Sequence, residues 1–170
     1  IAVVTVNNVD PTVNAGNDAI INEGGTFSST GSFTDPGTDT WTATVDYGDG
    51  SGVQNLTLTG KTFSLSHVYA DNGNYTVTVK VTDDDSGMGT DTAVVTVNNV
   101  APASVTLSAT PATIDENGST TVSVTFTDPG ILDGHTVVIT WGDGSPNTTL
   151  SLAANVLSFS ASHQYLDNKP

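Results

Sequence analysis

One short stretch occurs twice in this sequence and constrains the fold more than any other feature. Residues 45–51 read Val-Asp-Tyr-Gly-Asp-Gly-Ser, and residues 139–145 read Ile-Thr-Trp-Gly-Asp-Gly-Ser. In each copy every second residue before the glycine is apolar, which indicates a strand with one buried face. The Gly-Asp-Gly-Ser that follows supplies glycines for positive φ and side chains that bond to turn amides. Each stretch is therefore predicted to be a strand that runs into a tight turn.

These two stretches belong to a longer repeat. The letters Ala-Val-Val-Thr-Val-Asn-Asn-Val stand at 2–9 and again at 93–100, and Phe-Thr-Asp-Pro-Gly stands at 33–37 and again at 126–130. A repeat of about 100 residues has the size of one β-sandwich domain and is too long for a solenoid unit. We expect three parts: residues 1–8 as the last strand of a preceding repeat, 9–99 as a complete sandwich, and 100–170 as a second sandwich that stops before its last two strands.

Turn residues divide the complete repeat into short alternating segments, and none of them has helical periodicity. Short strands spaced about 8 to 12 residues apart are typical of an all-β sandwich. A chain rich in Thr and Val also favours β structure. Seven antiparallel strands are predicted, over residues 15–22, 26–33, 41–47, 54–59, 62–67, 75–82 and 90–98.

The net charge restricts the partners of the chain. Its 170 residues contain 18 Asp plus Glu and three Lys plus Arg, giving a formal net charge of -15, and no cysteine. Phosphate binding depends on Lys and Arg, so we expect neither a nucleic acid nor an anionic membrane surface as partner. No apolar run approaches the ~20 residues that span a bilayer, and no membrane insertion is expected. Divalent cations are the favoured charged partners.

Acidic loops are predicted to meet at one end of the complete repeat. Because the strands alternate in direction, the linker at 7–11, the loop at 35–39 and the loop at 83–87 fall at the same end, which we call the linker end. These segments contain no basic residue. We hypothesise a Ca²⁺ site there, since hard cations bind several oxygen ligands. Its predicted ligands are Asp35, Asp39, Asp83, Asp84 and Asn8, the last through its side chain or its carbonyl. The alternative is that these are solvated turn residues.

Several side chains near the Gly-Asp-Gly-Ser turns resemble catalytic groups. His67 and Tyr69, and their equivalents His163 and Tyr165, could act in acid–base chemistry beside Asp49. The favoured interpretation is structural, because one such set per repeat at a strand end is what a tyrosine corner of a sandwich needs. No set of nucleophile, base and oxyanion donors can be assembled, so we expect no enzyme.

The order of motifs along the chain resembles that of the polycystic-kidney-disease (PKD) domain. The motifs that carry this resemblance are Asn7-Asn8-Val9-Asp10-Pro11, Asn14-Ala15-Gly16, Asn22-Glu23-Gly24, the loop at 35–39, Tyr47-Gly48-Asp49-Gly50-Ser51, His67-Val68-Tyr69, residues 73–79 and Val81-Thr82-Asp83-Asp84-Asp85. Two positions depart from the family pattern: residues 45–47 lack the Trp that often precedes the aromatic, and His135 stands where the first repeat has Trp41.

The resemblance implies an immunoglobulin-like β-sandwich repeated in tandem in an extracellular or cell-surface protein, often bacterial, and some members of the family bind Ca²⁺ near the linker. We therefore expect a non-enzymatic structural module, a semi-rigid spacer, stalk or filament segment whose junctions calcium stiffens. The alternative is an adhesive module that binds polysaccharide or protein, as in an adhesin or beside a secreted hydrolase. Outward threonines such as Thr42, Thr44 and Thr76 favour the spacer.

The expected partners are neighbouring repeats of the same chain, and contacts with other copies remain open. An incomplete second sandwich would expose apolar inner faces and a strand edge. Ordinary truncation accounts for this. A second interpretation is that residues 1–6 of a neighbouring chain donate a strand by β-augmentation.

Overall fold

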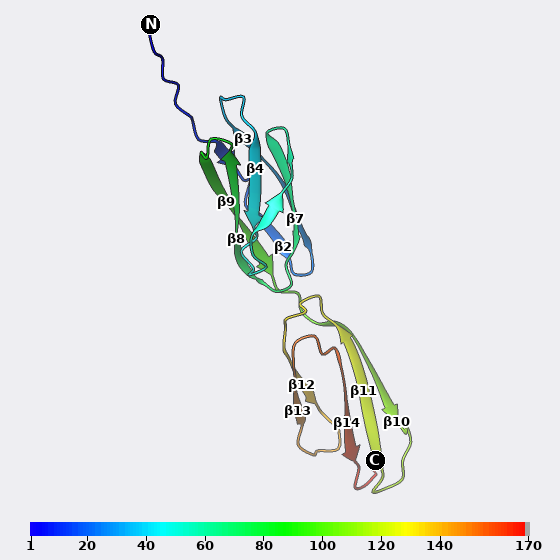
Figure 1. Cartoon of the computed structure of the whole chain (residues 1–170). Coiled ribbons are helices and arrows are strands. Elements are labelled where there is room, and N and C mark those ends of the chain that lie inside the picture. Colours follow the sequence, from blue (N-terminus) through cyan, green and yellow to red (C-terminus); the bar gives the residue numbers. More distant parts are fainter. Residues whose placement is uncertain (169–170) are drawn as a thin grey trace. The chain divides into compact units, whose positions relative to one another are not determined.

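The computed structural model describes residues 1–168, and these residues form 14 β-strands and no helix. None of them lies in a helix long and apolar enough to cross a membrane. The chain divides into two compact units, Ile1–Asn99 (unit 1) and Val100–Pro170 (unit 2). Each unit is built from packed β-sheets of the immunoglobulin-like class (Figure 1), as the sequence predicted.

Unit 1 is a sandwich of two sheets. The first has the order β1-β3-β7-β6 and the second the order β2-β9-β8-β4-β5. The strands of the first sheet are β1 (Thr12–Asn14), β3 (Thr26–Thr34), β6 (Leu58–Thr59) and β7 (Thr62–Val68). Those of the second are β2 (Ala19–Asn22), β4 (Trp41–Asp46), β5 (Gln54–Leu56), β8 (Gly73–Asp83) and β9 (Met88–Asn98).

The core of unit 1 follows from the alternation of apolar residues along its strands. On β8, Val77, Val79 and Val81 are fully buried, while the residues between them face solvent. Val77 and Val79 pack in one cluster with Phe27 and Leu65 of the other sheet, each at most 1% exposed, and Val81 packs with Phe33. Full burial of one such side chain is worth about 1.5–3 kcal/mol. This shared apolar interior holds the two sheets together.

Of the predicted first strand, 15–22, only residues 19–22 form a strand (β2), and a further strand (β1) precedes it at residues 12–14. β1 pairs antiparallel with β3, and β2 pairs parallel with β9. The chain changes sheets at Gly16, whose φ of +95° suits glycine. Two carboxylates hold residues 15–18 against β9: Asp91 accepts from the Ala15 amide at 2.8 Å, and Asp18 accepts from the Val94 amide at 2.7 Å. The single-strand prediction was wrong because the backbone of this part of the chain pairs first with β3 of one sheet and then with β9 of the other.

The predicted fourth strand, 54–59, is also divided. β5 pairs with β4 of one sheet and β6 with β7 of the other. Leu56 and Leu58 are both half-buried against the core, so each half keeps an apolar anchor. This division brings the turn that follows β6 next to the loop at 35–39. Lys61 at this turn donates to the carbonyl oxygen of Asp35.

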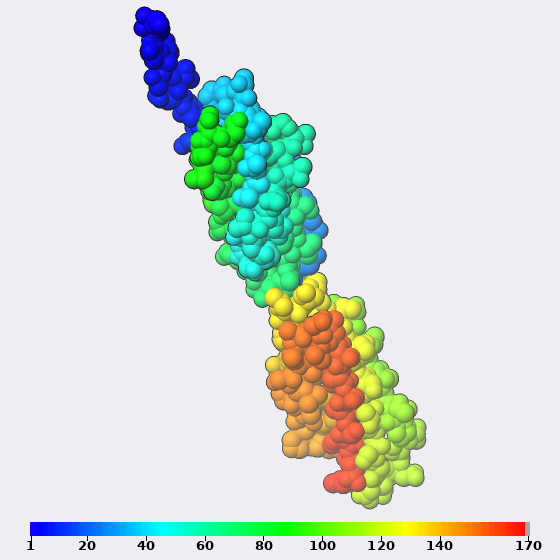
Figure 2. Space-filling view, viewed as in Figure 1, coloured from blue at the N-terminus to red at the C-terminus, as the bar shows by residue number. Residues whose placement is uncertain are grey.

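Residues 1–8 form no strand. Their apolar side chains are exposed, with Val4 at 82% and Val6 at 89% of full exposure. In Figure 2 this segment, in dark blue, extends away from the body of unit 1. Its letters nevertheless repeat those of β9, which lies inside the second sheet.

Unit 2 contains five strands within its described residues. β10 (Ala103–Thr110), β11 (Ser119–Thr127) and β14 (Ser158–Gln164) form one sheet. β12 (His135–Ile139) and β13 (Thr148–Leu152) form a two-stranded sheet. Val122, Val124 and Phe126 of β11 are the most buried apolar residues of the first sheet, at 6–8% exposed. The core of unit 2 is therefore less enclosed than that of unit 1.

Candidate cation site

The three segments predicted to meet at the linker end of unit 1 are neighbours in the structure. A depression there is lined by residues of the linker, of the loop at 35–39 and of the β8–β9 turn. Asn8 donates from Nδ2 to Oδ2 of Asp83 at 2.9 Å, which ties the linker to the end of β8. The alternation of strand direction thus predicted correctly which loops come together.

Asp35 and Asp83 are buried and already hydrogen-bonded. Asp35 is 7% exposed and accepts from the Gly37 amide and from Nε1 of Trp41, both at 3.0 Å. Asp83 is 5% exposed and accepts from the Gly87 amide at 2.7 Å in addition to the bond from Asn8. The bond from Trp41, with that from Gly37, lowers the pKa of Asp35. Both carboxylates therefore shape the loops that carry the more exposed acids.

Three further carboxylates lie close together at this end: Asp84 and Asp85, which are exposed, and Asp39, which is half-buried. One oxygen of each lies within 4.8 Å of the others, a spacing at which a single cation reaches all three. Asp84 also accepts from the Thr40 amide at 3.3 Å, which links the two loops. Burial, together with the charges of Asp35 and Asp84, raises the pKa of Asp39. The sequence hypothesis named Asp39 and Asp84 and missed Asp85, although Asp85 stands in the same acidic run.

Lys61 was not expected at the linker end. Its Nζ donates to the carbonyl oxygen of Asp35 and lies 4.6 Å from the centre of the Trp41 ring. It comes from the turn between β6 and β7, which the sequence analysis did not assign to this end. Lys61 places one positive charge beside the acidic loops, on the side of Asp35 and Trp41.

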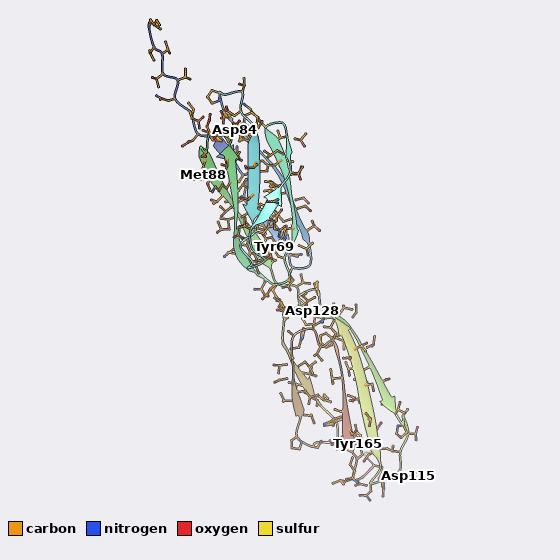
Figure 3. The ribbon with its side chains drawn as sticks, viewed as in Figure 1. Tyr69, Asp84, Met88, Asp115, Asp128 and Tyr165 are labelled. Carbon is orange, nitrogen blue, oxygen red and sulfur yellow. The ribbon has the colours of Figure 1, made fainter. Side chains whose placement is uncertain are left out.

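The opposite end of unit 1 carries the Gly-Asp-Gly-Ser turn and its supports. Nε2 of His67 lies 2.7 Å from Oδ2 of Asp49, and the His67 ring stacks on Tyr47 with centroids 4.2 Å apart. Tyr69, fully buried, donates to the carbonyl oxygen of Tyr47 at 3.0 Å. Figure 3 shows Tyr69 and Asp84 at opposite ends of this unit. His67 and Tyr69 thus make the contacts that the predicted structural corner requires.

The equivalent group in unit 2 contains a serine, and its geometry differs from a catalytic triad. Nε2 of His163 faces Asp143 at 2.8 Å and Ser145 Oγ at 3.5 Å, while Ser145 Oγ is 2.5 Å from Oδ1 of Asp143. In a triad the histidine stands between acid and serine and uses a different nitrogen for each. Here the same nitrogen faces both, and the serine is bound to the carboxylate. The contacts hold the turn.

A bond from Ser145, with one from His163, lowers the pKa of Asp143. At the matching position in unit 1, burial alone would raise the pKa of Asp49. Hydrogen bonds from Ser51 and His67 outweigh burial and lower that pKa to about 2. Both aspartates are thus held as carboxylates over the whole neutral and mildly acidic range.

Comparison with known proteins agrees with the immunoglobulin-like class. The model of the PKD domain family matches residues 8–98, which is more than half of the chain. The chain therefore belongs to the PKD domain family. PKD domains are generally non-catalytic modules and are typical of extracellular proteins.

Among solved structures, the chain is similar to the PKD domain of an M14-like peptidase from Thermoplasmatales archaeon SCGC AB-540-F20. The identity is 27%, the match covers 54% of this chain and 98% of that chain, and the TM-score is 0.43. A chimeric titin Z1Z2-Z1Z2 tandem is 15% identical over 92% of this chain and 98% of that chain, with a TM-score of 0.40.

A third similar structure is Bacteroides ovatus SGBP-B in complex with a mixed-linkage heptasaccharide, at 15% identity over 94% of this chain and 46% of that chain, with a TM-score of 0.41. Comparison with curated protein sequences gave no match.

Proposed function

We propose that this chain is part of an extracellular or cell-surface spacer, in which PKD sandwiches follow one another as a semi-rigid stalk. A Ca²⁺ ion at the linker end of unit 1 fixes the linker to the sandwich. The observation that carries the proposal is the set of three carboxylates, from two loops, whose oxygens lie within 4.8 Å of one another.

The contacts around these carboxylates give each residue a part. Asp39, Asp84 and Asp85 supply the charged oxygens. Asp35 and Asp83 keep the two loops in place through their bonds to Gly37 and Gly87. Asn8, bonded to Asp83, brings the linker to the same depression. Burial raises the pKa of Asp39, and repulsion from the neighbouring acids raises it further. A cation that neutralises the three acids removes this repulsion, so binding favours the arrangement in which the loops and the linker lie together.

A spacer is favoured over a polysaccharide-binding module by the position of the aromatic residues. Within residues 1–168 every Phe, Tyr and Trp is buried or half-buried, and those of unit 1 pack in or against the core. A sugar ring is bound most strongly against an exposed aromatic face, and these residues do not offer one. The outer side of the β8 strand carries Thr76, which is exposed, and Thr78 and Thr82, which are half-buried.

Calcium binding is tested by thermal unfolding of the chain in CaCl2 and in EGTA. The unfolding of unit 1 is monitored through its NMR amide signals. Calcium at about 100 times its Kd stabilises the folded state by about 2.7 kcal/mol, so the unfolding midpoint of unit 1 rises. The variant with Asp39→Asn and Asp84→Asn should lose the rise. These two changes leave the loop-forming Asp35 and Asp83 intact.

The matched control carries Asp46→Asn and Asp71→Asn, which remove the same charge at the opposite end of unit 1. Both residues accept local turn amides, and asparagine keeps an oxygen for that bond. The control should respond to calcium as the parent chain does. A midpoint that calcium leaves unchanged in the parent chain would end the proposal of a calcium-stiffened linker.

A further inference from the structure

Two glycines at the turn between β8 and β9 lie directly against the linker. Neither Gly87 nor Gly89 has a positive φ, so the backbone conformation does not require glycine at either position. A Cβ atom on Gly89 would collide with the carbonyl oxygen of Pro11, and one on Gly87 would lie 2.7 Å from Nδ2 of Asn8. The linker therefore occupies the space that side chains at these two positions would fill.

The linker meets the end of β8 at Gly87. A Cβ atom added there would lie 2.5–2.7 Å from three side-chain atoms, Oδ2 of Asp83, Oδ1 of Asp10 and Nδ2 of Asn8. Asp83 is fixed from within the sandwich, because its Oδ1 accepts from the Gly87 amide at 2.7 Å and its own amide donates to the Gly87 carbonyl oxygen at 3.0 Å. Asp83 is thus a fixed acceptor, and the absence of a side chain on Gly87 keeps it accessible to the linker.

Asn8 brings the donor to this group of side chains. Its Nδ2 donates to Oδ2 of Asp83 at 2.9 Å. Asp10 and Asp83 are carboxylates, which only accept hydrogen bonds when they are ionised, and two such groups close together repel each other. A neutral amide bonds to a carboxylate without adding to this repulsion. The residue type at position 8 therefore decides whether the linker is attracted to the end of β8 or repelled by it.

We propose that Asn8, Asp83 and Gly87 form a latch that attaches the linker to unit 1 without calcium. Asn8 supplies the donor, Asp83 is the fixed acceptor, and Gly87 leaves the space in which the two side chains meet. Gly89 extends the attachment, because it lets the backbone of Pro11 lie close to β9. A hydrogen bond to a carboxylate is stronger than one between neutral groups.

The latch goes beyond the proposed calcium site and does not depend on it. The carboxylates that would hold the ion are Asp39, Asp84 and Asp85, and none of them belongs to the latch. Without calcium the latch still fixes the place at which the chain enters unit 1. Calcium then adds to an attachment that already exists.

The backbone mobility of the linker tests the proposal, measured by ¹⁵N NMR relaxation of the 170-residue chain in EGTA. In the parent chain the amides of residues 8–10 should have order parameters of about 0.85, as in a rigid backbone. Asn8→Ala removes the donor, so these order parameters should fall below about 0.6. Asn8→Asp should have the same effect, because it places a third carboxylate beside Asp10 and Asp83. The matched controls Asn7→Ala and Asn7→Asp make the same changes at the neighbouring exposed asparagine and should leave the order parameters unchanged.

Gly87→Ala tests the other side of the latch. The added methyl group displaces the side chains of Asn8 and Asp10, which are exposed and free to move, so the linker should become mobile while unit 1 stays folded. A linker that is already mobile in the parent chain overturns the proposal. Order that survives Asn8→Ala, or an equal loss of order in Asn7→Ala, overturns it too. Every measurement is made in EGTA, so these outcomes are separate from the calcium response of the unfolding midpoint.

Discussion

The two units share the hydrogen-bonded corner at the Gly-Asp-Gly-Ser turn and differ in the sheet beside it. In unit 1 the histidine-to-aspartate distance is 2.7 Å and the tyrosine hydroxyl to carbonyl distance is 3.0 Å. In unit 2 the same contacts measure 2.8 Å, from His163 to Asp143, and 3.1 Å, from Tyr165 to the carbonyl of Trp141. The corner forms alike in both units because its residues lie only 18 to 24 positions apart along the chain and bond directly to each other.

The strand that follows the change of sheet at Gly16 forms in unit 1 but has no counterpart in unit 2. In unit 1 β2 pairs parallel with β9, a partner about 76 residues away along the chain. In unit 2 the equivalent residues 112–115 form no strand. Backbone groups adopt strand geometry where another strand satisfies them, so this element depends on a distant partner. The corner is thus encoded locally, and the second sheet is encoded by long-range pairing.

The largest effect is expected where this difference changes burial. Phe63 and Phe159 occupy equivalent positions on β7 and β14, but Phe63 is 2% exposed in the closed core, whereas Phe159 is half-buried and lines an apolar groove of unit 2. Phe63→Ala should lower the free energy of unfolding of unit 1 by about 3–5 kcal/mol, the usual cost of removing a buried Phe. Phe159→Ala should cost unit 2 clearly less, because solvent already reaches its site.

Urea unfolding followed through NMR amide signals measures each unit separately. The control is Phe63→Leu, which keeps most of the apolar contact and should cost much less than the alanine. Equal losses for Phe63→Ala and Phe159→Ala would contradict the view that unit 1 alone has a closed core.

A smaller effect tests what the two corners have in common. Folding lowers the pKa of Asp49 from 3.8 to about 2, so the folded state binds fewer protons than the unfolded state in this range. The stability that this carboxylate contributes is therefore present above pH 3.8 and lost as the pH falls toward 2. Asp49→Asn should cost unit 1 about 1 kcal/mol at pH 6, through the lost charge on the bond to His67, and should flatten the decline between pH 3.8 and 2.

Urea unfolding at several pH values between 6 and about 2 provides the measurement. Asp143→Asn should act in the same direction on unit 2, since folding lowers the pKa of Asp143 as well. If only one unit responded, the two corners would not be energetically equivalent despite their matching distances.

The sequence predicted the corner and the meeting of the acidic loops, because both follow from neighbouring letters and from strand alternation. It did not predict the change of sheet at Gly16. Val13 and Ala15 point into the same core as Ala19 and Ile21 on the other sheet, so the apolar pattern continues across the break. Period-two alternation tells which face is buried and does not tell which sheet supplies the partner.

The candidate site was predicted in the same incomplete way. Composition pointed to Asp35 and Asp83 as readily as to Asp39 and Asp84. The sequence does not show which carboxylates accept hydrogen bonds from backbone amides of their own loops. The structure separates them through the bonds from Gly37, Trp41 and Gly87. Lys61 was missed because its place at the linker end depends on the division between β5 and β6.

Lys61 provides the most specific comparison. In unit 2 the turn before β14 has Ala153, Ala154 and Asn155 and no lysine. Lys61→Met should cost unit 1 about 1 kcal/mol in EGTA, by removing the contact with the Trp41 ring and the bond to Asp35. The same change removes a positive charge beside the acidic loops, so calcium affinity should rise a few-fold. Urea unfolding and calorimetric titration measure these opposite effects, and Lys80→Met, on the exposed side of β8, should produce neither. A fall in calcium affinity in Lys61→Met would show instead that the lysine holds Asp35 and its loop in the geometry that the ion requires.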